Sequence, residues 1–484
     1  MPHPSLLLAF FPARELRVPV KTDAEACDGA EPACDDESGV CCVCQSALDD
    51  ALAPKEALLC ALHNERTPLL SKKLNDNGKS TFGQTLFNSI AILLGIGMLS
   101  EPLAFAYAGW GMGFVLIIFY GYVSCYTAKI VARIILSDPS LRSYADIGCK
   151  AFGPRSTLVV SVLFCLELFA VSVILVTLSA DSLHVLVPQY SSDVYKLLGI
   201  FLLIPTVFLP LSLLSITSVL GIISTILVVV VVLIDGVSKT ESPGSLWSPA
   251  ETSFGIDSWN HLGIAFGLFM AGFGGHPVIP SLAKDMVDPS RFNEMINWAF
   301  AVATFIYALI ACAGYLMFGS AVSAEISVDL LSTPGYNKMI NQTVLWMLVL
   351  VPLSKFGLIT QPLSAVLDTL LERDQGPQDH LPKTVSNTRP KTPVLSPRAL
   401  FVLQRVGITV LSVAVSILVP QFSAAMAFLG SFTVFLLCVI GPIVAKVAIE
   451  DGWRWGVFDV VVVLLAAGMA VWGTGSACLE GSAA

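Results

Sequence analysis

The feature that most limits the fold of this chain is a series of long apolar stretches that recur along most of its 484 residues. A helix that crosses a lipid bilayer needs about 20 mostly apolar residues. The composition agrees, because 55% of the residues are hydrophobic and 13% are charged, whereas soluble domains carry about 25% charged residues. We therefore expect an all-α membrane protein with one transmembrane domain over residues 81–478. The stretches predict eleven spans, at about residues 84–107, 111–135, 156–180, 196–213, 215–235, 261–281, 295–318, 339–366, 399–419, 422–447 and 455–478.

Two polar regions lie outside these spans. Residues 1–80 are expected to form a disordered tail, and residues 372–398, rich in Pro, Asp, Lys and Arg, a mobile loop. The short apolar run at residues 6–11 has no basic segment before it, so a cleaved signal peptide is not expected. No feature of the chain indicates binding of nucleic acid.

Six of the 12 cysteines lie in the tail. Zinc would need four ligands in suitable geometry, and Cys42 and Cys44 are closer together than the usual pair of zinc ligands. We favour a disordered tail with reduced thiols, and palmitoylation or metal capture is the alternative. No metal site and no cofactor are predicted.

The basic residues predict the orientation in the membrane, since cytosolic loops carry an excess of Lys and Arg. With the N-terminus in the cytosol, the tail and every second loop receive most of the basic residues. The opposite side receives Lys196, Lys239 and Lys338. An odd number of spans then places the C-terminus on the far, luminal side.

Two apolar stretches are interrupted by glycine and proline, the first and the sixth along the chain. The first interruption runs from Gly95 to Pro102 and the second from Gly272 to Pro277. Backbone groups freed by a broken helix are tolerated in a membrane only where protein or water surrounds them. A matched pair of breaks is a sequence indicator of the substrate site in transporters built from inverted repeats.

The chemistry of such a site suits an amino acid. Free N–H groups at the start of a half-helix attract a carboxylate, and freed carbonyl groups accept hydrogen bonds from an ammonium group. The alternative is that Gly and Pro are merely more common in membrane helices, which explains two matched breaks poorly. The predicted substrate-binding residues are Gly95, Gly97, Met98, Ser100, Gly272, Gly274 and Gly275.

Four ionisable residues fall inside the predicted spans. A charge at the centre of a membrane helix costs roughly 2.5–3.5 kcal/mol, so a functional role is the first hypothesis. We expect proton coupling to involve Glu101, Glu167, His276 and Lys355. Each has a structural alternative. Glu101 would face water in a vestibule, Glu167 would be neutral and hydrogen-bonded, His276 would satisfy freed backbone, and Lys355 would be a counter-charge for Glu167.

Two short motifs lie near the spans. Glu65 and the pair Leu69 and Leu70 fit the acidic dileucine pattern E-x-x-x-L-L, which sorting adaptors read on the cytosolic side. Asn341 begins a glycosylation sequon on the far side. Its position at the start of a span makes its modification doubtful.

The sequence around the first break resembles the amino acid/auxin permease family. The resemblance rests on Gly95-Ile-Gly97-Met-Leu99-Ser-Glu-Pro102-Leu-Ala104, on Tyr107-Ala-Gly-Trp110, on Ala151-Phe-Gly-Pro154 and on Gly274-Gly-His-Pro-Val-Ile-Pro280. Asp181-Ser-Leu183 and Pro210-Leu-Ser212 resemble its fungal vacuolar amino acid transporter branch. The likeness covers about residues 80–475. Glu101 departs from the family pattern, in which an apolar residue is expected.

The resemblance implies a leucine-transporter-like fold of two inverted five-helix repeats and one further helix, with helices 1 and 6 broken. It implies a multi-pass protein of the vacuolar membrane that moves neutral amino acids by proton-coupled antiport. In this architecture the eighth span faces the first, where relatives can hold sodium. A lysine there, Lys355, would point to protons as the coupling ion.

A second hypothesis uses the same pocket. An amino acid sensor would bind its ligand without net transport and signal through its tail. An enzyme is not expected, since neither a zinc-binding H-E-x-x-H motif nor a nucleophile elbow G-x-S-x-G occurs in the sequence.

Overall fold

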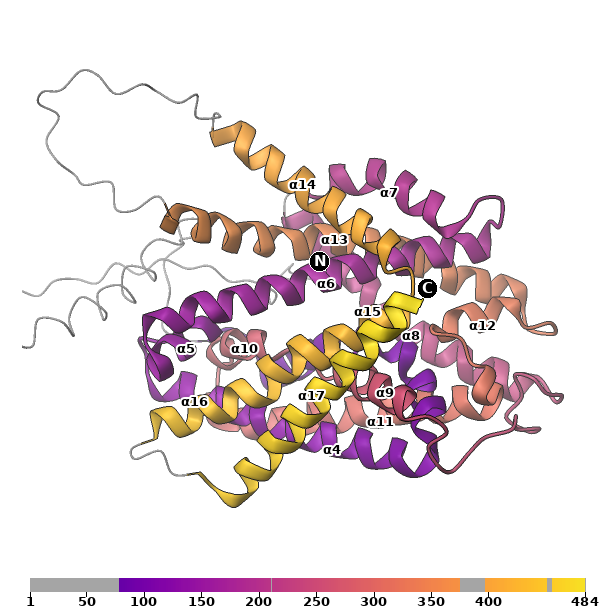
Figure 1. Ribbon diagram of the computed structural model, residues 1–484, viewed down its shortest axis with the longest axis horizontal. Helices are drawn as coiled ribbons and strands as arrows, with labels where there is room; N and C mark the ends of the chain where they lie inside the picture. The colour runs from indigo at the N-terminus through magenta and orange to yellow at the C-terminus, as the bar shows by residue number, and fades with distance from the viewer. Residues whose placement is uncertain (1–77, 210, 375–396, 451–454, 484) are drawn as a thin grey trace, which may run out of the picture.

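The computed structural model describes residues 78–209, 211–374, 397–450 and 455–483 of the chain. These residues form a bundle of long helices with shorter helices and loops at both ends (Figure 1). The α-helices are α3 (Phe82–Leu93), α4 (Glu101–Ser137), α5 (Tyr144–Phe152), α6 (Pro154–Leu186), α7 (Ser192–Thr206), α8 (Leu211–Ser238), α9 (Trp259–Gly272), α10 (Ile279–Asp285), α11 (Phe292–Phe318), α12 (Ile326–Ser332), α13 (Lys338–Asp374), α14 (Pro397–Leu418), α15 (Phe422–Phe428), α16 (Gly441–Ile449) and α17 (Val457–Ala483). The 3₁₀-helices are η2 (Ile96–Ser100), η3 (His276–Val278), η4 (Pro289–Arg291) and η5 (Gly319–Ala321), and η6 (Leu429–Ile440) is a π-helix.

Within the part of the chain that the structure describes, nine helical stretches are long and apolar enough to cross a membrane. The all-α membrane fold is confirmed, whereas the count of eleven is not. The first two expected spans fall in α3 and in one run from Ile96 to Ser137. The fourth corresponds to α7, which has 15 residues. The inverted relation between two five-helix repeats stays a prediction.

The chain reverses its direction inside α4. Gly109 has φ of 71°, a conformation that favours glycine. The rings of Phe105 and Phe114 lie 5.3 Å apart, whereas nine residues of straight helix rise about 13.5 Å. The segments before and after Gly109 therefore pack against each other, close to the boundary expected between the first two spans.

The turn between the fourth and fifth expected spans lies earlier than the sequence indicated. It was expected near residues 213–215, but α7 ends at Thr206 and α8 begins at Leu211. Pro205 lies in the last turn of α7, and proline lacks the N–H group that would continue the helix. The expected loop 372–398 lies mostly outside the described residues, and α13 extends three residues into it, to Asp374.

Both expected helix breaks are present. The helix α3 ends at Leu93 and the chain continues through η2 into α4, while α9 ends at Gly272 and continues through η3 into α10. The stretch Trp259–Asp285 contains the second break, and 72% of its apolar 18-residue segment is buried. The corresponding share for Val457–Gly481 in α17 is 28%. The second break therefore lies inside the bundle, where protein surrounds its freed backbone groups.

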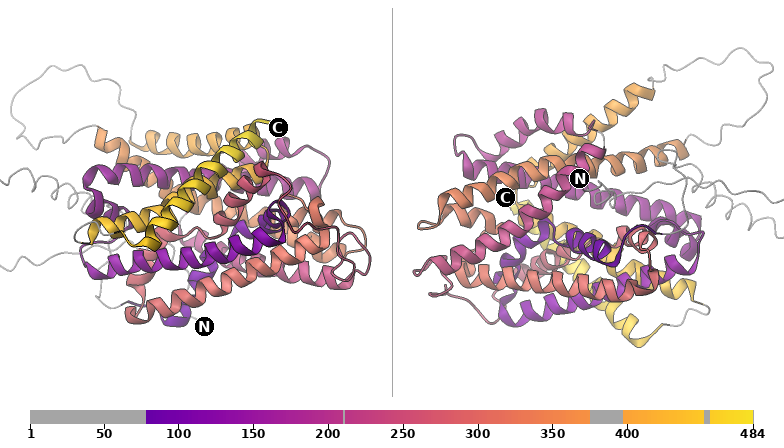
Figure 2. Two further views of the ribbon diagram at one scale, coloured as in Figure 1. Left: turned by 60° about the horizontal axis from the view of Figure 1, so that its bottom comes forward. Right: turned by 180° about the vertical axis from the view of Figure 1, so that it is seen from behind.

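The two ends of the described chain lie at opposite ends of the bundle. Lys79 and Ser80 donate backbone hydrogen bonds to Asp285 at the end of α10, on the side of α5. The helix α17 starts beside α16, through an ion pair of Lys446 with Asp459, and finishes where Ser423 at the start of α15 donates to Glu480. Figure 1 shows α5 and α10 at one end and α12 at the other, and Figure 2 shows the same bundle from two further sides. The chain thus crosses the bundle an odd number of times.

Candidate functional site

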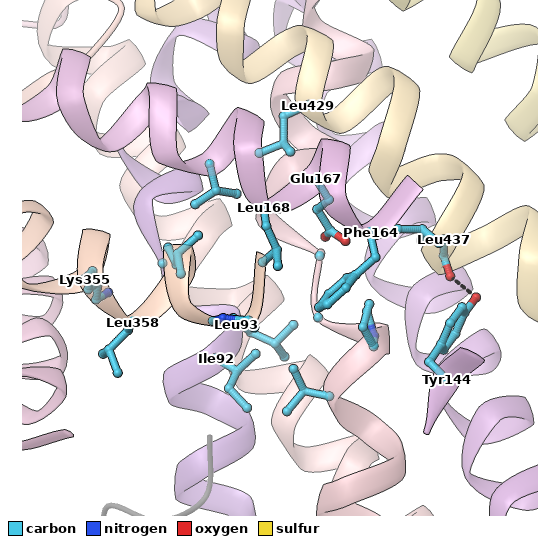
Figure 3. Close-up of a pocket in the computed structure, with 18 of the residues that line it drawn as sticks. Ile92, Leu93, Tyr144, Phe164, Glu167, Leu168, Lys355, Leu358, Leu429 and Leu437 are labelled. Carbon is cyan, nitrogen blue, oxygen red and sulfur yellow. Dashed lines mark hydrogen bonds between the residues drawn. The ribbon is translucent and has the colours of Figure 1, made fainter. Parts of the chain in front are cut away.

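One cavity of about 690 Å³ is lined by both helix breaks. Its wall contains five of the seven residues that the sequence indicated for substrate binding: Gly95, Gly97, Gly272, Gly274 and Gly275. Most of the remaining wall consists of apolar side chains from α6, α13 and η6, with Phe164 and Leu168 on one helix and Leu358 on another (Figure 3). The cavity therefore offers backbone polar groups and an apolar lining.

Met98 and Ser100 do not line the cavity. Their side chains are buried, with 2% and 0% exposure. The Ser100 hydroxyl donates to the carbonyl oxygen of Gly97 at 3.0 Å. Ser100 therefore stabilises the backbone of the first break and faces away from the space that a ligand would fill.

The first break is open toward the cavity. Gly95 has extended backbone between α3 and η2 and no side-chain cap. A Cβ atom at Gly95 would meet no atom closer than 3.8 Å. The Thr225 hydroxyl on α8 lies 3.4 Å from the carbonyl oxygen of Leu94 and donates to it. The backbone of the first break thus borders free space on one side and α8 on the other.

The second break is fastened to α4 by a side chain. Gly275 has φ of 143°, which L-residues rarely adopt. The next residue, His276, is fully buried, and its Nε2 atom lies 2.9 Å from the Thr127 hydroxyl and 3.1 Å from the Ser124 carbonyl oxygen. Because a carbonyl oxygen only accepts, Nε2 carries the proton. His276 does not line the cavity and holds the break against α4.

The two breaks touch each other through glycine. A Cβ atom on Gly97 would lie 2.8 Å from the Cα atom and 2.9 Å from the nitrogen atom of Gly272. Real Cβ atoms do not approach backbone so closely, so a side chain at Gly97 would push the breaks apart. Gly97 therefore contributes both to the contact between the two breaks and to the wall of the cavity.

Sequence reasoning missed Tyr307 on α11. Its side chain is fully buried, and its hydroxyl contacts the carbonyl oxygens of Leu93 and, at 2.8 Å, of Gly272. These are the last residues of α3 and α9, so one hydroxyl bridges the C-terminal ends of both half-helices. A tyrosine inside an apolar span needs a polar partner, and this signal was available in the sequence.

Glu167 and Lys355 both line the cavity, from α6 and α13 (Figure 3). The Oε2 atom of Glu167 has no hydrogen-bond partner among the described residues. Lys355 packs beside Gly221 on α8, where an added Cβ atom would lie 2.8 Å from its Cε atom. The two side chains form no ion pair in the described part of the chain, so Lys355 is not paired with Glu167 in this conformation.

Glu101 lies behind the cavity wall. Its side chain is 0% exposed, and neither carboxyl oxygen has a hydrogen-bond partner within the described ranges. A Cβ atom on Gly272 would lie 2.9 Å from its Oε1 atom. The suggestion that Glu101 faces water in a vestibule is therefore wrong for this conformation.

The cavity reaches the surface at the end of the bundle that holds α5. Its wall includes Arg142 and Ser143, which are exposed. Tyr144 on α5 donates a hydrogen bond of 2.5 Å to the Leu437 carbonyl oxygen of η6, and burial raises the pKa of its hydroxyl well above the usual value. Beside it, the Lys150 ammonium holds the pKa of Asp138 below its usual range.

The opposite end is covered by α12. Burial raises the pKa of Asp329 on this helix to about 6, although the carboxylate accepts two hydrogen bonds from Ser323. Burial and the nearby charge of Asp181 raise the pKa of Glu325. Asn341 is fully buried and donates to Asp235 and to the Leu330 carbonyl oxygen. The sequon asparagine is therefore part of the core in this conformation.

The predicted sorting residues Glu65, Leu69 and Leu70 lie outside the described residues, as does the cysteine-rich tail.

A family model described as "Transmembrane amino acid transporter protein" matches residues 78–478, the part of the chain that contains both breaks and the cavity. This chain belongs to the transmembrane amino acid transporter family. The resemblance that the first break indicated is thus confirmed, and the family is one of transporters rather than enzymes.

Relatives of this chain occur in Arabidopsis thaliana and Xenopus tropicalis. The amino acid transporter AVT1D of Arabidopsis thaliana is 27% identical over 388 residues, which cover 77% of this chain and 64% of that protein. AVT1B of the same plant is 27% identical, and the matched residues cover 71% of that protein. The vesicular inhibitory amino acid transporter of Xenopus tropicalis is 25% identical over 418 residues, 82% of this chain and 76% of that protein.

The fold of this chain is also found among solved structures. The inward-facing conformation of Mhp1 is similar with a TM-score of 0.51 at 11% identity, over 84% of this chain and 90% of that chain. At this identity the likeness concerns the fold alone.

Proposed function

We propose that this protein is a secondary active transporter that moves neutral amino acids across the vacuolar membrane by exchange for protons. The observation that carries the proposal is a cavity whose wall combines the backbone of both helix breaks. Backbone N–H and C=O groups freed at half-helix ends can bind the carboxylate and the ammonium group of one amino acid.

The wall of the cavity supports a neutral substrate. Most of the side chains that surround the breaks are aliphatic or aromatic, and apolar side chains of a substrate would pack against them. The ionisable groups on the wall are few and carry both signs, as with Glu167 and Lys355.

Proton coupling is supported by the position of Lys355. It packs beside Gly221 on α8, and Thr225, four residues further on the same helix, donates to the first break at Leu94. A lysine ammonium near this break would supply a fixed positive charge where a sodium ion would otherwise be needed. Glu167, on the cavity surface, is a carboxyl that can take up and release a proton during the cycle.

The orientation follows from the charges. Lys129, Arg133, Arg142 and Lys150 belong to the end of the bundle where α5 lies and the cavity opens. By the excess of Lys and Arg in cytosolic loops, this end faces the cytosol and the C-terminus faces the lumen. The conformation then accepts amino acid from the cytosol.

Transport in liposomes tests the proposal. Purified protein should accumulate neutral amino acids in response to an imposed pH gradient and should ignore a sodium gradient. Glu167→Gln should weaken the pH-driven accumulation but keep exchange at equal pH, and Lys355→Ala should impair both with the fold intact. A requirement for sodium, or full pH-driven uptake by Glu167→Gln, would contradict this coupling scheme.

The sensor remains the second candidate, because the same cavity would also bind a ligand without turnover. Specific binding of an amino acid to purified protein, together with no uptake under any gradient, would favour the sensor.

Localisation is tested separately. The name of the Xenopus relative places that protein in vesicles, and the fungal branch that this sequence resembles is vacuolar. A sorting adaptor that reads Glu65, Leu69 and Leu70 would direct the protein there. Changing Leu69 and Leu70 to Ala should move it to the cell surface, and unchanged localisation by microscopy would remove the motif from the proposal.

A further inference from the structure

Behind the cavity, several oxygen atoms converge where the two breaks meet. The carbonyl oxygens of Leu93 and Gly272 end α3 and α9, and the Tyr307 hydroxyl contacts both. The last carbonyls of a helix carry partial negative charge. The carboxyl group of Glu101 lies beside Gly272 in the same region.

The surroundings of Glu101 do not suit an ionised carboxylate. The side chain has no exposure, both oxygens lack a hydrogen-bond partner, and no ion pair reaches it from any described residue. An unpaired buried carboxylate is strongly unfavourable, whereas a protonated carboxyl group is neutral and carries a donor. In this conformation the group therefore holds a proton.

Among the described residues, the ring of Tyr307 on α11 lies against the same position as the Glu101 carboxyl group. A Cβ atom on Gly272 would lie 2.9 Å from Oε1 of Glu101 and 3.1 Å from Cε2 of Tyr307. The helix α12 packs against η2, and its residue Asp329 accepts a hydrogen bond from Ser323. Glu325, just before α12, accepts one from Ser327. Gly97 and Gly272, which lie against each other, both line the cavity, whereas Glu101, beside Gly272, does not.

We propose that Glu101 is a proton-binding residue of the transport cycle, sealed between the two helix breaks, and that Tyr307 is its positioning residue. The inference rests on the proposed transport function and adds a second carboxyl to Glu167. A proton binds to a carboxyl oxygen of Glu101 and leaves from it, and no other bond changes.

The location explains how proton binding and conformation would be linked. The proton can leave only when the contact of Gly97 with Gly272 opens, because this contact closes the route to the cavity. Loss of the proton puts a negative charge beside the negative ends of α3 and α9, which favours their separation. The protonated state favours the closed junction seen here.

The experiment uses the full-length protein in liposomes and compares Glu101→Gln with Glu167→Gln. Glutamine keeps the size of the side chain but cannot release a proton. Glu101→Gln should lose accumulation driven by a pH gradient and keep exchange of labelled amino acid at equal pH. Full pH-driven accumulation by this variant would overturn the inference, whereas no uptake by the unaltered protein would overturn the proposed function instead.

Infrared difference spectroscopy provides a readout that does not depend on transport. The unaltered protein should show the C=O band of a protonated carboxyl without hydrogen bonds. This band should persist in Glu167→Gln and be absent from Glu101→Gln. If it is unchanged in Glu101→Gln, Glu101 does not hold the proton.

The role of Tyr307 is tested by Tyr307→Phe, with Tyr195→Phe on α7, outside the cavity wall, as the matched control. Both changes remove a hydroxyl that donates to a backbone carbonyl. Only the change at Tyr307 should shift the Glu101 band and weaken pH-driven accumulation. Equal behaviour of the two variants would show that Tyr307 has no special relation to Glu101.

Discussion

The two helix breaks have similar sequences but are held in different ways. The second break is bound to α4 through His276, whose ring contacts Thr127 and Ser124. The first break has no such anchor from its own side chains to another helix, within the described residues, and is contacted through its carbonyl groups by Thr225 and Tyr307. Glycine and proline therefore indicate where a helix opens but do not determine whether the opened segment is held in place. We infer that the second break is the fixed wall of the cavity and the first is the movable one.

The largest effect is expected where the two breaks touch. Gly97→Val should abolish transport, because the side chain would collide with the backbone of Gly272, and overpacking of this kind costs about 1–3 kcal/mol. Gly275→Val should act similarly through its backbone conformation. Gly83→Val is the control, since nothing lies within 4 Å of a Cβ atom there. Uptake in liposomes measures the effect, and normal uptake by Gly97→Val would contradict the contact.

The next effect concerns the anchor of the second break. His276→Ala would remove the contacts of its ring nitrogen with the Thr127 hydroxyl and the Ser124 carbonyl oxygen on α4, and a hydrogen bond of this kind contributes about 0.5–1.5 kcal/mol. The thermal unfolding temperature of the purified protein should fall. The pH dependence of the remaining transport should keep its midpoint, because His276 acts as an anchor here. A shifted midpoint with unchanged stability would instead assign proton coupling to His276.

A smaller effect is expected in α12, which packs beside η2 in the first break. The pKa of Asp329 is raised from its ordinary 3.8 to about 6 by burial. The folded state therefore binds this proton more tightly than the unfolded state. The resulting stabilisation is fully present below about pH 4 and is lost as the pH rises through about 6.

The test of this prediction is Asp329→Asn. Acidification from pH 7 to pH 4 should stabilise the unaltered protein more than the variant, by on the order of 1–3 kcal/mol. Thermal unfolding in detergent at both pH values measures the difference. The same pH response in both proteins would show that Asp329 does not contribute.

The smallest effect is expected on the movable side. Thr225→Val keeps the shape of the side chain and removes its hydrogen bond to Leu94, along with its bond to Gly221, which contributes about 0.5–1.5 kcal/mol. If the first break moves during transport, the variant should change the transport rate more than the unfolding temperature. Thr409→Val on α14 is the control, because this hydroxyl donates within its own helix, to Arg405. Equal effects of both variants on the transport rate would argue against a movable first break.

Much of the architecture was predictable from the chain. A membrane-spanning helix needs about 20 consecutive, mostly apolar residues, so composition alone indicates the apolar stretches. Both helix breaks lie where glycine and proline are clustered in the sequence. The count of spans was less predictable, because a reversal at one residue, Gly109, and a short helix, α7, change how stretches are divided. The turn after Pro205 was misplaced because apolar residues continue on both sides of it.

By itself, the sequence determined which segments open and which ionisable residues lie within the long apolar stretches, because both depend on the order of residues along the chain. The tertiary structure decided which of these residues share a space. It placed Gly95 and Glu167 on the cavity and turned Ser100 and Glu101 away from it. It also brought Tyr307, from a distant helix, to both breaks. These positions depend on how each helix is rotated and packed against its neighbours, and a local pattern of residues does not determine that rotation.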